Sequence, residues 1–275
     1  MLIILLLVFL FHFKKKNMNL LKFIKPFEEV SKQNNLIIRL GWFMLLISIW
    51  VISAMGETHM FPTPNQVWTG LADLYNEGLV THIFSSLALC GKAVLVSIVI
   101  SLLLVYLSPI PLLNPIGNLL SKFRYLPLTG IAFYITVLVN DGRSIQVWIL
   151  VTFMSTYLIT SLLSMLKEIK TEEFDHARAL GCNRWEILWE VVIKGRMDYV
   201  IEIIRQNLAI VWMMLVTVES ILAASGGLGF LIKNSDKFGN HGRIIALQFV
   251  ILLAGLFMDY FLTFVRKSLF RYSKI

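Results

Sequence analysis

Long apolar segments constrain this chain more than any other feature of its sequence. The hydrocarbon core of a bilayer takes a helix of roughly 20 apolar residues, and six segments approach that length. They cover about residues 37–56, 84–107, 125–140, 145–166, 199–223 and 244–265. The third is the shortest, and Pro127 and Gly130 predict that it is kinked. The pattern predicts an all-α integral membrane protein with about six transmembrane helices.

Composition excludes most other classes of protein. Hydrophobic residues make up 57% of the 275 residues and charged residues 15%, against about 45–50% and about 25% in a typical soluble domain. A soluble globule of this size could not bury so much apolar side chain. Cys90 lies in a predicted span and Cys182 in a predicted loop, so the two cannot pair and a disulfide framework is excluded.

The distribution of charge predicts an orientation in the membrane. Basic residues gather before the first segment, after the second, between the fourth and fifth, and after the sixth. Cytoplasmic loops carry such an excess, so both termini are expected on the cytoplasmic side of the membrane; the basic stretch 233–243 is the exception. Because the charges are dispersed along membrane boundaries, the net charge of +8 does not indicate a nucleic-acid partner.

The N-terminus carries one more apolar run. Residues 1–13 are apolar and are followed by three lysines at 14–16, whereas a signal peptide carries its positive charge before the apolar core. We expect an over-extended start, with Met18 as the true first residue; an extra short helix is the alternative. The predicted organisation is a cytoplasmic segment at 1–36 and a membrane domain at 37–270.

Motifs for catalysis, metals and cofactors are missing. The five histidines include no pair at i,i+4 on one helix, and the sequence has no G-x-x-x-x-G-K-[ST] phosphate loop and no G-x-S-x-G elbow. These are the patterns by which zinc sites, nucleotide sites and serine hydrolases are recognised. We therefore expect no catalytic residue, metal or cofactor in this chain, and no enzyme activity of its own.

The predicted cytoplasmic loop at 167–198 has the pattern of two helices. Thr171 and the acids that follow it are typical of a helix N-terminus. Apolar residues recur at helical spacing from Phe174 to Leu180, and Gly181 is placed to end that helix in the left-handed conformation. A second amphipathic helix is predicted to follow, with four apolar residues on one face: Trp185, Leu188, Trp189 and Val192.

The segment D-H-A-R-A-L-G, Asp175–Gly181, resembles the EAA loop of bacterial ABC importer permeases. That loop reads Glu-Ala-Ala, three residues, then Gly; here Asp175, His176 and Ala177 stand at the first three positions and Gly181 at the glycine. The segments Phe61–Trp68 and Ala224–Ile232 are similar to the nitrate/sulfonate/taurine/bicarbonate permease group, as are four single residues: Arg124, Pro127, Glu219 and Asp259. The resemblance covers roughly residues 58–270.

This resemblance implies a location in a bacterial inner membrane, a function and a set of partners. Residues 172–195 would form a coupling loop that docks on a cytoplasmic ABC ATPase, which binds ATP and Mg²⁺. An extracytoplasmic solute-binding protein would deliver a small anion such as nitrate, a sulfonate or taurine, or a related organic compound, and a second permease would complete the pathway. The docking residues implied are Asp175, His176, Ala177, Arg178, Leu180 and Gly181.

The chain also departs from the family pattern. His176 replaces the first alanine of the motif, Lys194 and Asp198 stand where prolines are usual, and Lys92 lies near the usual place of an arginine. These departures bear on the substrate and on coupling to the ATPase rather than on the fold.

Several polar residues at membrane depth are candidates for function. Glu219 could have a functional role, lining the pathway or holding an outer gate. The alternative is an interfacial residue near solvent. Arg205 lies about 21 Å earlier on the same helical stripe and either attracts an anion or pairs with Glu202. Lys92 is expected to snorkel to the outer interface, and Asp259 to pair with a cytoplasmic Lys or Arg. The glycines after the fifth segment would allow a sharp re-entrant turn, with a flexible surface loop as the alternative: Gly226, Gly227 and Gly229.

Two other classes of membrane protein fit less well. A secondary transporter driven by an ion gradient would show inverted repeats and paired intramembrane carboxylates, and the sequence shows neither. A membrane-embedded enzyme would need convergent histidines and acids near one interface, which are also missing.

Overall fold

The computed structural model describes residues 32–54, 61–222 and 226–270, and within these ranges all regular structure is helical. The chain divides into two units, Met1–Thr69 and Gly70–Ile275. The first contains α2 (Lys32–Ala54) and the beginning of α3 (Pro64–Asn76). Trp42, Phe43 and Leu46 of α2 are each more than half exposed. Such a helix meets apolar surroundings only in a bilayer or against a partner.

The core of the second unit is formed by α4 (Leu79–Leu107) and α7 (Gly142–Lys167). The hydroxyl of Ser97 donates to the carbonyl of Val151 over 3.3 Å, and that of Ser101 to the carbonyl of Ser155 over 3.4 Å. Both positions advance by four residues together, so the two helices run in the same direction. Small residues on α4 allow this close approach, as is usual between membrane helices.

Because α4 and α7 are parallel, the chain must return between them, and it does so in two short helices. These are α5 (Asn114–Lys122) and α6 (Leu128–Leu138), separated by a 3₁₀ turn at Phe123–Tyr125. Nine and eleven residues rise roughly 14 Å and 17 Å, so neither alone crosses a core of about 30 Å. The predicted third span is therefore wrong as a single helix: Pro127 holds an extended backbone and breaks it.

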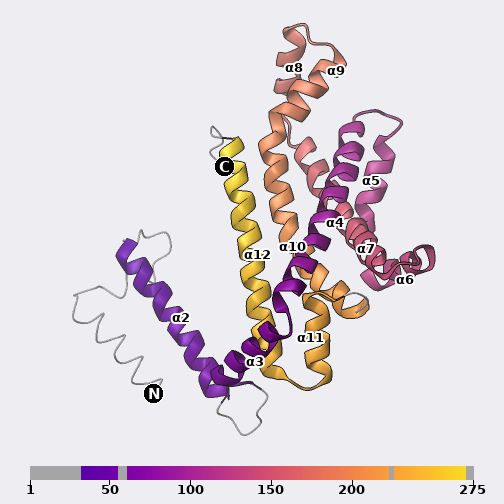
Figure 1. The fold of residues 1–275 in the computed structure, drawn as a ribbon. Coiled ribbons are helices and arrows are strands. Elements are labelled where there is room, and N and C mark those ends of the chain that lie inside the picture. The colour runs from indigo at the N-terminus through magenta and orange to yellow at the C-terminus, as the bar shows by residue number, and fades with distance from the viewer. Residues whose placement is uncertain (1–31, 55–60, 223–225, 271–275) are drawn as a thin grey trace. The chain divides into compact units, whose positions relative to one another are not determined.

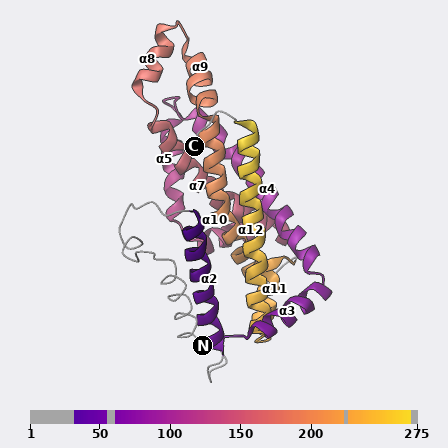
Figure 2. The ribbon, with the colours of Figure 1, turned by 90° about the vertical axis from the view of Figure 1, so that its left-hand side faces the viewer.

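On the other side of α7, α10 (Met197–Leu222) pairs with α12 (His241–Leu269). The indole N–H of Trp212 donates to the carbonyl of Ile251 over 3.0 Å, and Arg205 contacts Asp259 nearer the N-terminal end of α10. These pairs run in opposite directions along the chain, so the two helices are antiparallel. Figures 1 and 2 show both standing side by side.

A further helix, α11 (Leu228–Lys237), packs against α10, α12 and α4. The sequence did not predict this helix or α3 and α5, because each is short and only partly apolar. The turn that precedes α11 was expected, and it is present: Gly226 and Gly227 have φ angles of 79° and 116°. Gly227, Leu228 and Gly229 are buried, so the flexible surface loop considered as an alternative is wrong.

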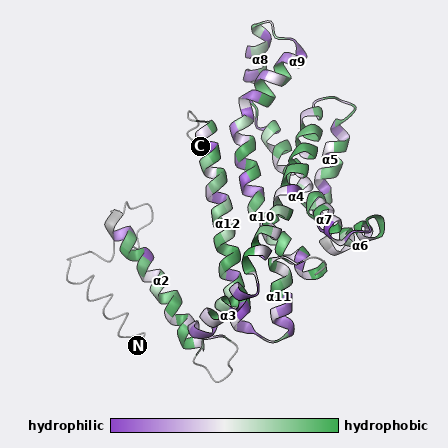
Figure 3. Cartoon of the chain, in the orientation of Figure 1, coloured by the Kyte–Doolittle hydropathy of each residue, from purple (hydrophilic) through white to green (hydrophobic). Residues whose placement is uncertain are grey.

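Five helical runs in the described ranges are long and apolar enough to cross a membrane, in agreement with five of the six predicted segments. Figure 3 shows the apolar residues spread along α12 and over much of α4. Leu253, Phe257 and Tyr260 of α12 are each about two-thirds exposed. The surface of this unit is thus apolar where the long helices lie.

The fifth run is longer than predicted. A helical stretch of 39 residues extends from Arg184 to Leu222, whereas the sequence placed the start of the span at residue 199. It begins with α9 (Arg184–Ile187), continues through a π-helical segment, η3 (Leu188–Ile193), and a 3₁₀ turn, η4 (Lys194–Arg196), and becomes α10. The predicted second helix of the loop is therefore the first part of this run.

Candidate functional site

The predicted coupling loop is present as two helices at one end of the second unit. α8 (Thr171–Ala179) and α9 stand beyond the ends of the long helices in both views (Figures 1 and 2). Glu172 and Glu173 occupy the first turn of α8, and His176 and Arg178 its last turn. Acidic residues near the N-terminus and basic residues near the C-terminus both interact favourably with the helix macrodipole.

Gly181 ends α8 as the sequence predicts. Its φ angle is 81°, and two hydrogen bonds close the end: Gly181 N–H donates to Arg178 and Cys182 N–H to Ala177. This is the Schellman arrangement, in which a left-handed residue satisfies the last carbonyls of a helix. A Cβ at Gly181 would have no atom within 4 Å, so the surface there is open.

The start of α9 is fixed by a capping box that our reading of the sequence missed. The side-chain oxygen of Asn183 accepts from the N–H groups of Trp185 and Glu186 over 2.9 and 3.0 Å. The Glu186 carboxylate in turn accepts from Asn183 N–H over 2.7 Å. The signal is present in N-R-W-E, an Asn followed three residues later by Glu.

Within the loop, the motif residues divide into buried and exposed sets. Ala177 is buried, and its small size fits the packing of α8 against α9 and η3. Asp175 and Arg178 pair with each other over 2.8 Å on the surface. His176 and Gly181 are exposed. Three large apolar side chains also lie on the surface, with exposed fractions between 53% and 71%: Leu180, Trp185 and Trp189.

An ion pair joins the two halves of the loop. The guanidinium of Arg196, in η4, lies 2.5 Å from the carboxylate of Glu173, in α8. Because η4 leads directly into α10, this pair connects α8 to the beginning of that helix. The loop is therefore attached to the membrane helices at both of its ends.

Glu219 lies in a buried polar cluster at the far end of α10. Its side chain has no exposed surface, so the interfacial alternative near solvent is wrong. The hydroxyl of Ser86 lies 2.8 Å from both carboxylate oxygens, and Gly229 N–H donates to one of them over 3.0 Å. Leu228 N–H donates to the Ser86 oxygen and Gly227 N–H to Nδ1 of His82.

The cluster explains why glycines follow α10. A Cβ on Gly227 would overlap the Glu219 carboxylate, and one on Gly229 would overlap the carbonyl of Val216. Because neither glycine has a Cβ atom, the N-terminus of α11 can approach the Glu219 carboxylate. The helix dipole is positive at that end and stabilises the negative charge. The cluster joins α4, α10 and α11; a role of Glu219 in a pathway or gate stays a prediction.

Arg205 lies in a second cluster, nearer the loop. Its guanidinium contacts Glu202 over 2.6 Å and Asp259 of α12 over 2.5 Å. Arg266 of α12 also pairs with Glu202. Two cations and two carboxylates thus join α10 to α12, which confirms the predicted pairing of Arg205 with Glu202. Asp259 pairs with Arg205, within the predicted fifth span, and not with a basic residue of a cytoplasmic segment as the sequence predicts. Attraction of an anion by Arg205 stays a prediction.

Within the described ranges, no group of three or more His, Cys, Asp or Glu residues could hold a metal ion. The site thus consists of a loop with exposed apolar side chains at one end of the membrane helices. Two clusters of polar residues, around Glu219 and around Arg205, join those helices to one another.

The sequence is similar to those of known transport permeases. The chain is 26% identical over 161 residues to the taurine transport system permease protein TauC of Escherichia coli (strain K12), covering 58% of this chain and 56% of that protein. It is 22% identical over 249 residues to a Bacillus subtilis (strain 168) protein named "Putative aliphatic sulfonates transport permease protein SsuC", covering 85% and 89%. The match to the taurine permease thus spans about half of that protein.

A solved structure has a similar fold. The MetNI methionine ABC transporter in inward-facing conformations includes a chain that matches with a TM-score of 0.55 and 17% identity, over 70% of this chain and 94% of that one. In addition, residues 71–271 match the family model described as "Binding-protein-dependent transport system inner membrane component". Because this match covers well over half of the sequence, the chain belongs to the family of binding-protein-dependent transport system inner membrane components.

Proposed function

We propose that this chain is the membrane subunit of an ATP-driven importer and that α8 and α9 are the surface on which a cytoplasmic ATPase docks. The observation that carries the proposal is the exposed apolar set Leu180, Trp185 and Trp189 on a loop beyond the membrane helices. Exposed clustered aromatics are typical of protein interfaces. The family match and the TauC and SsuC relatives support this over a transporter driven by an ion gradient.

The chain's own residues would pass movement from the ATPase to the membrane helices. α9 is continuous with α10, and the pair Glu173–Arg196 holds α8 to the same junction. Displacement of the loop therefore enters α10 directly. The hydrolysis of ATP, with its Mg²⁺, takes place in the separate ATPase subunit.

The orientation follows from the docking surface. With α8 and α9 in the cytoplasm, the C-terminal end of α12, which carries Arg266 and Lys267, also lies on that side, as the positive-inside rule expects. One candidate span among the described residues, α2, precedes α4, so the beginning of α2 lies on the cytoplasmic side too. The Glu219 cluster then faces the extracytoplasmic half of an inner membrane.

The remaining partners follow from the kind of subunit. We propose that a second copy of this chain completes the pathway, because one small bundle of helices leaves no room for a closed pathway of its own. An extracytoplasmic binding protein would deliver the solute. Since one relative is named for taurine and another for aliphatic sulfonates, we propose a small organic anion as the substrate class.

The docking surface is tested by co-purification of the tagged chain with its ATPase. Gly181→Trp places a large side chain in open space, and its positive φ costs any non-glycine residue roughly 1–2 kcal/mol. Gly181→Ala carries the same strain without the bulk, and Gly239→Trp repeats the change at a second open, positive-φ glycine at the other end of the helices. Capture should fail with Gly181→Trp alone. Capture of the ATPase by Gly181→Trp at the wild-type level would exclude this surface.

A further inference from the structure

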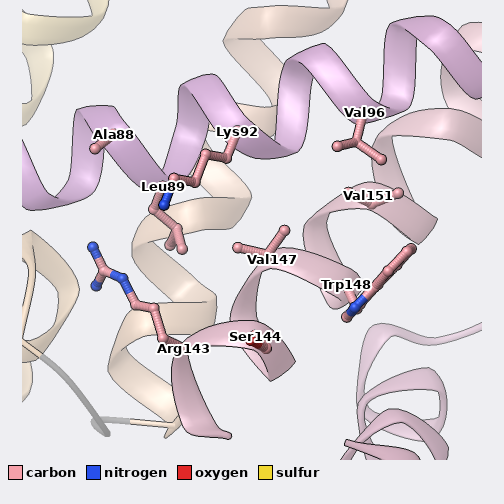
Figure 4. Close-up of a pocket in the computed structure, with 9 residues that line it drawn as sticks. All are labelled: Ala88, Leu89, Lys92, Val96, Arg143, Ser144, Val147, Trp148 and Val151. Atoms are coloured by element: carbon pink, nitrogen blue, oxygen red, sulfur yellow. The ribbon is translucent and has the colours of Figure 1, made fainter.

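A cavity of about 290 Å³ lies between α4 and α7, outside both polar clusters (Figure 4). Two cationic side chains line it: Lys92 extends from α4 toward α7, and Arg143 extends from the beginning of α7 toward α4. Ser144, Val147 and Trp148 of α7 form the wall beside them. A volume of this size has room for roughly ten water-sized groups.

Arg143 already has partners within the protein. Its guanidinium donates to the carbonyl and to the hydroxyl of Ser85, both over 2.7 Å. The carboxylate of Glu219 is also close enough to interact with it electrostatically. Arg143 is therefore held in place and partly neutralised, which fixes one wall of the cavity.

Lys92 has no such carboxylate. Among the seven ion pairs found in the described ranges, none includes Lys92. Its side chain is exposed, at the fourteenth residue of the 29-residue helix α4. The contacts of Ser97 with Val151 and of Ser101 with Ser155 place it opposite the first turns of α7. A cation at the edge of a membrane core is stabilised by water or by a group of opposite charge, so Lys92 is open to an anion.

The remaining surroundings favour a negative charge in the cavity. Arg143 and Ser144 lie in the first turn of α7, where the helix dipole is positive. The Asp141 carboxylate caps the same turn through Ser144 N–H, but its side chain is exposed and its charge is screened by solvent. Val147 and Trp148 offer an apolar wall next to the two cations.

We propose that this cavity binds a singly charged oxyanion group, such as a sulfonate or a phosphate diester, between Lys92 and Arg143, with an apolar part against Val147 and Trp148. The anion is either a small free solute or the headgroup of an anionic lipid, which share this chemistry. That a free solute bound here is the transported one rests on the proposed function; that the cavity binds an anion does not.

The test uses the purified full-length chain in nanodiscs of phosphatidylcholine, without any ATPase. Iodide is an anion that quenches tryptophan fluorescence, and acrylamide is a neutral quencher of the same kind. The signal of Trp148 is the difference between the wild type and Trp148→Phe. Lys92→Gln should lower iodide quenching of Trp148 by roughly two- to fivefold, the effect of one partly exposed charge pair, and leave acrylamide quenching unchanged.

Two control variants accompany this change. Lys92→Arg keeps the charge and should keep iodide quenching. Lys267→Gln removes a positive charge from the last turn of α12 and should also leave Trp148 quenching unchanged. Equal iodide quenching of Trp148 in the wild type and Lys92→Gln would overturn the proposal.

Competition then identifies the source of the anion. Ethanesulfonate added at constant ionic strength should relieve iodide quenching, and ethylammonium should not, if the site takes a free anion. Relief only when the nanodiscs contain phosphatidylglycerol assigns the site to a lipid headgroup. Failure of both ethanesulfonate and phosphatidylglycerol to relieve quenching would show diffuse attraction rather than a site, and would also overturn the proposal. Since no ATPase is present, these outcomes are independent of the docking experiment.

Discussion

Ser86→Ala tests whether the buried carboxylate of Glu219 organises the junction of α4, α10 and α11. The Ser86 hydroxyl makes two kinds of contact: it donates to the Glu219 carboxylate and accepts from Leu228 N–H, each over 2.8–2.9 Å. Alanine removes both and leaves a backbone N–H and a carboxylate without these partners. Because Ser86 and Glu219 are fully buried, water does not readily replace the lost hydroxyl.

The size of the effect follows from these two losses. A hydrogen bond to a charged group contributes roughly 1.5–3 kcal/mol, and a buried donor left unsatisfied costs roughly 1–3 kcal/mol. Allowing for some relaxation, we expect Ser86→Ala to lower the free energy of unfolding by about 2–5 kcal/mol. The matched control is Ser97→Ala, on the same helix and equally buried. Its hydroxyl donates only to neutral carbonyls, so its loss should cost about 0.5–1.5 kcal/mol.

Unfolding can be followed at a single thiol. The sequence has two cysteines, of which Cys90 on α4 is buried, so a thiol-reactive dye in a Cys182→Ser background reports exposure of Cys90 on heating. At roughly 2–4 °C per kcal/mol for a protein of this size, Ser86→Ala should lower the midpoint by about 4–20 °C and Ser97→Ala by no more than about 6 °C. Equal shifts for the two variants would refute the argument that the carboxylate, and not burial of a hydroxyl, matters at this junction.

Three further predictions follow from the packing and the charges. Gly229→Ala should lower the same midpoint, because a Cβ there overlaps backbone and overpacking costs about 1–3 kcal/mol; Gly91→Ala, whose Cβ has no atom within 4 Å, should not. Glu202→Gln should destabilise the α10–α12 pair by about 1–3 kcal/mol, since it leaves two guanidinium groups facing one carboxylate; no change in midpoint would contradict this. The hydrogen bond from Ser144 lowers the pKa of Asp141 below its ordinary value, so the contribution of Asp141 to stability is present at neutral pH and is lost as the pH falls through that lowered pKa. Asp141→Asn should remove this share of the acid sensitivity, which a comparison of midpoints from about pH 7 down to about pH 2 would measure.

The sequence predicted the long helices well because burial in a bilayer leaves a direct signal in apolar residues. Five of the predicted segments correspond to long apolar helical runs, and the two helices of the coupling loop are present with Gly181 at the turn. Local chemistry, such as the dipole, the left-handed glycine and the spacing of apolar residues, decides these elements. Such features depend on a few neighbouring residues and can be read from a single sequence.

The sequence did not predict features that depend on contacts between distant segments. Ser86 and Glu219 are separated by 133 residues, and no local pattern indicates that they meet. The short helices α3, α5 and α11 carry too few apolar residues to be recognised as membrane elements. The break at Pro127 was expected as a kink, but its extent depends on the need to return the chain between two parallel helices.

The polar contacts between helices indicate which helices move together when the coupling loop is displaced. α4 and α7 are held together by the hydroxyls of Ser97 and Ser101 and by Arg143, and α10 and α12 by the four charges around Arg205. Between these two pairs, the described residues make polar contacts at Glu219, at the end of α10 far from the loop, and one longer contact of 3.5 Å between Asn207 of α10 and Ser161 of α7.

Apolar surfaces slide at lower cost than charged hydrogen bonds break. A displacement that enters α10 through α9 should therefore move α10 and α12 together, relative to α4 and α7, about the Glu219 junction. Ser86→Ala should then weaken the contacts of Glu219 that join α10 to α4 and leave the α10–α12 contacts in place. Glu202→Gln should weaken the α10–α12 contacts and leave those of Glu219 in place.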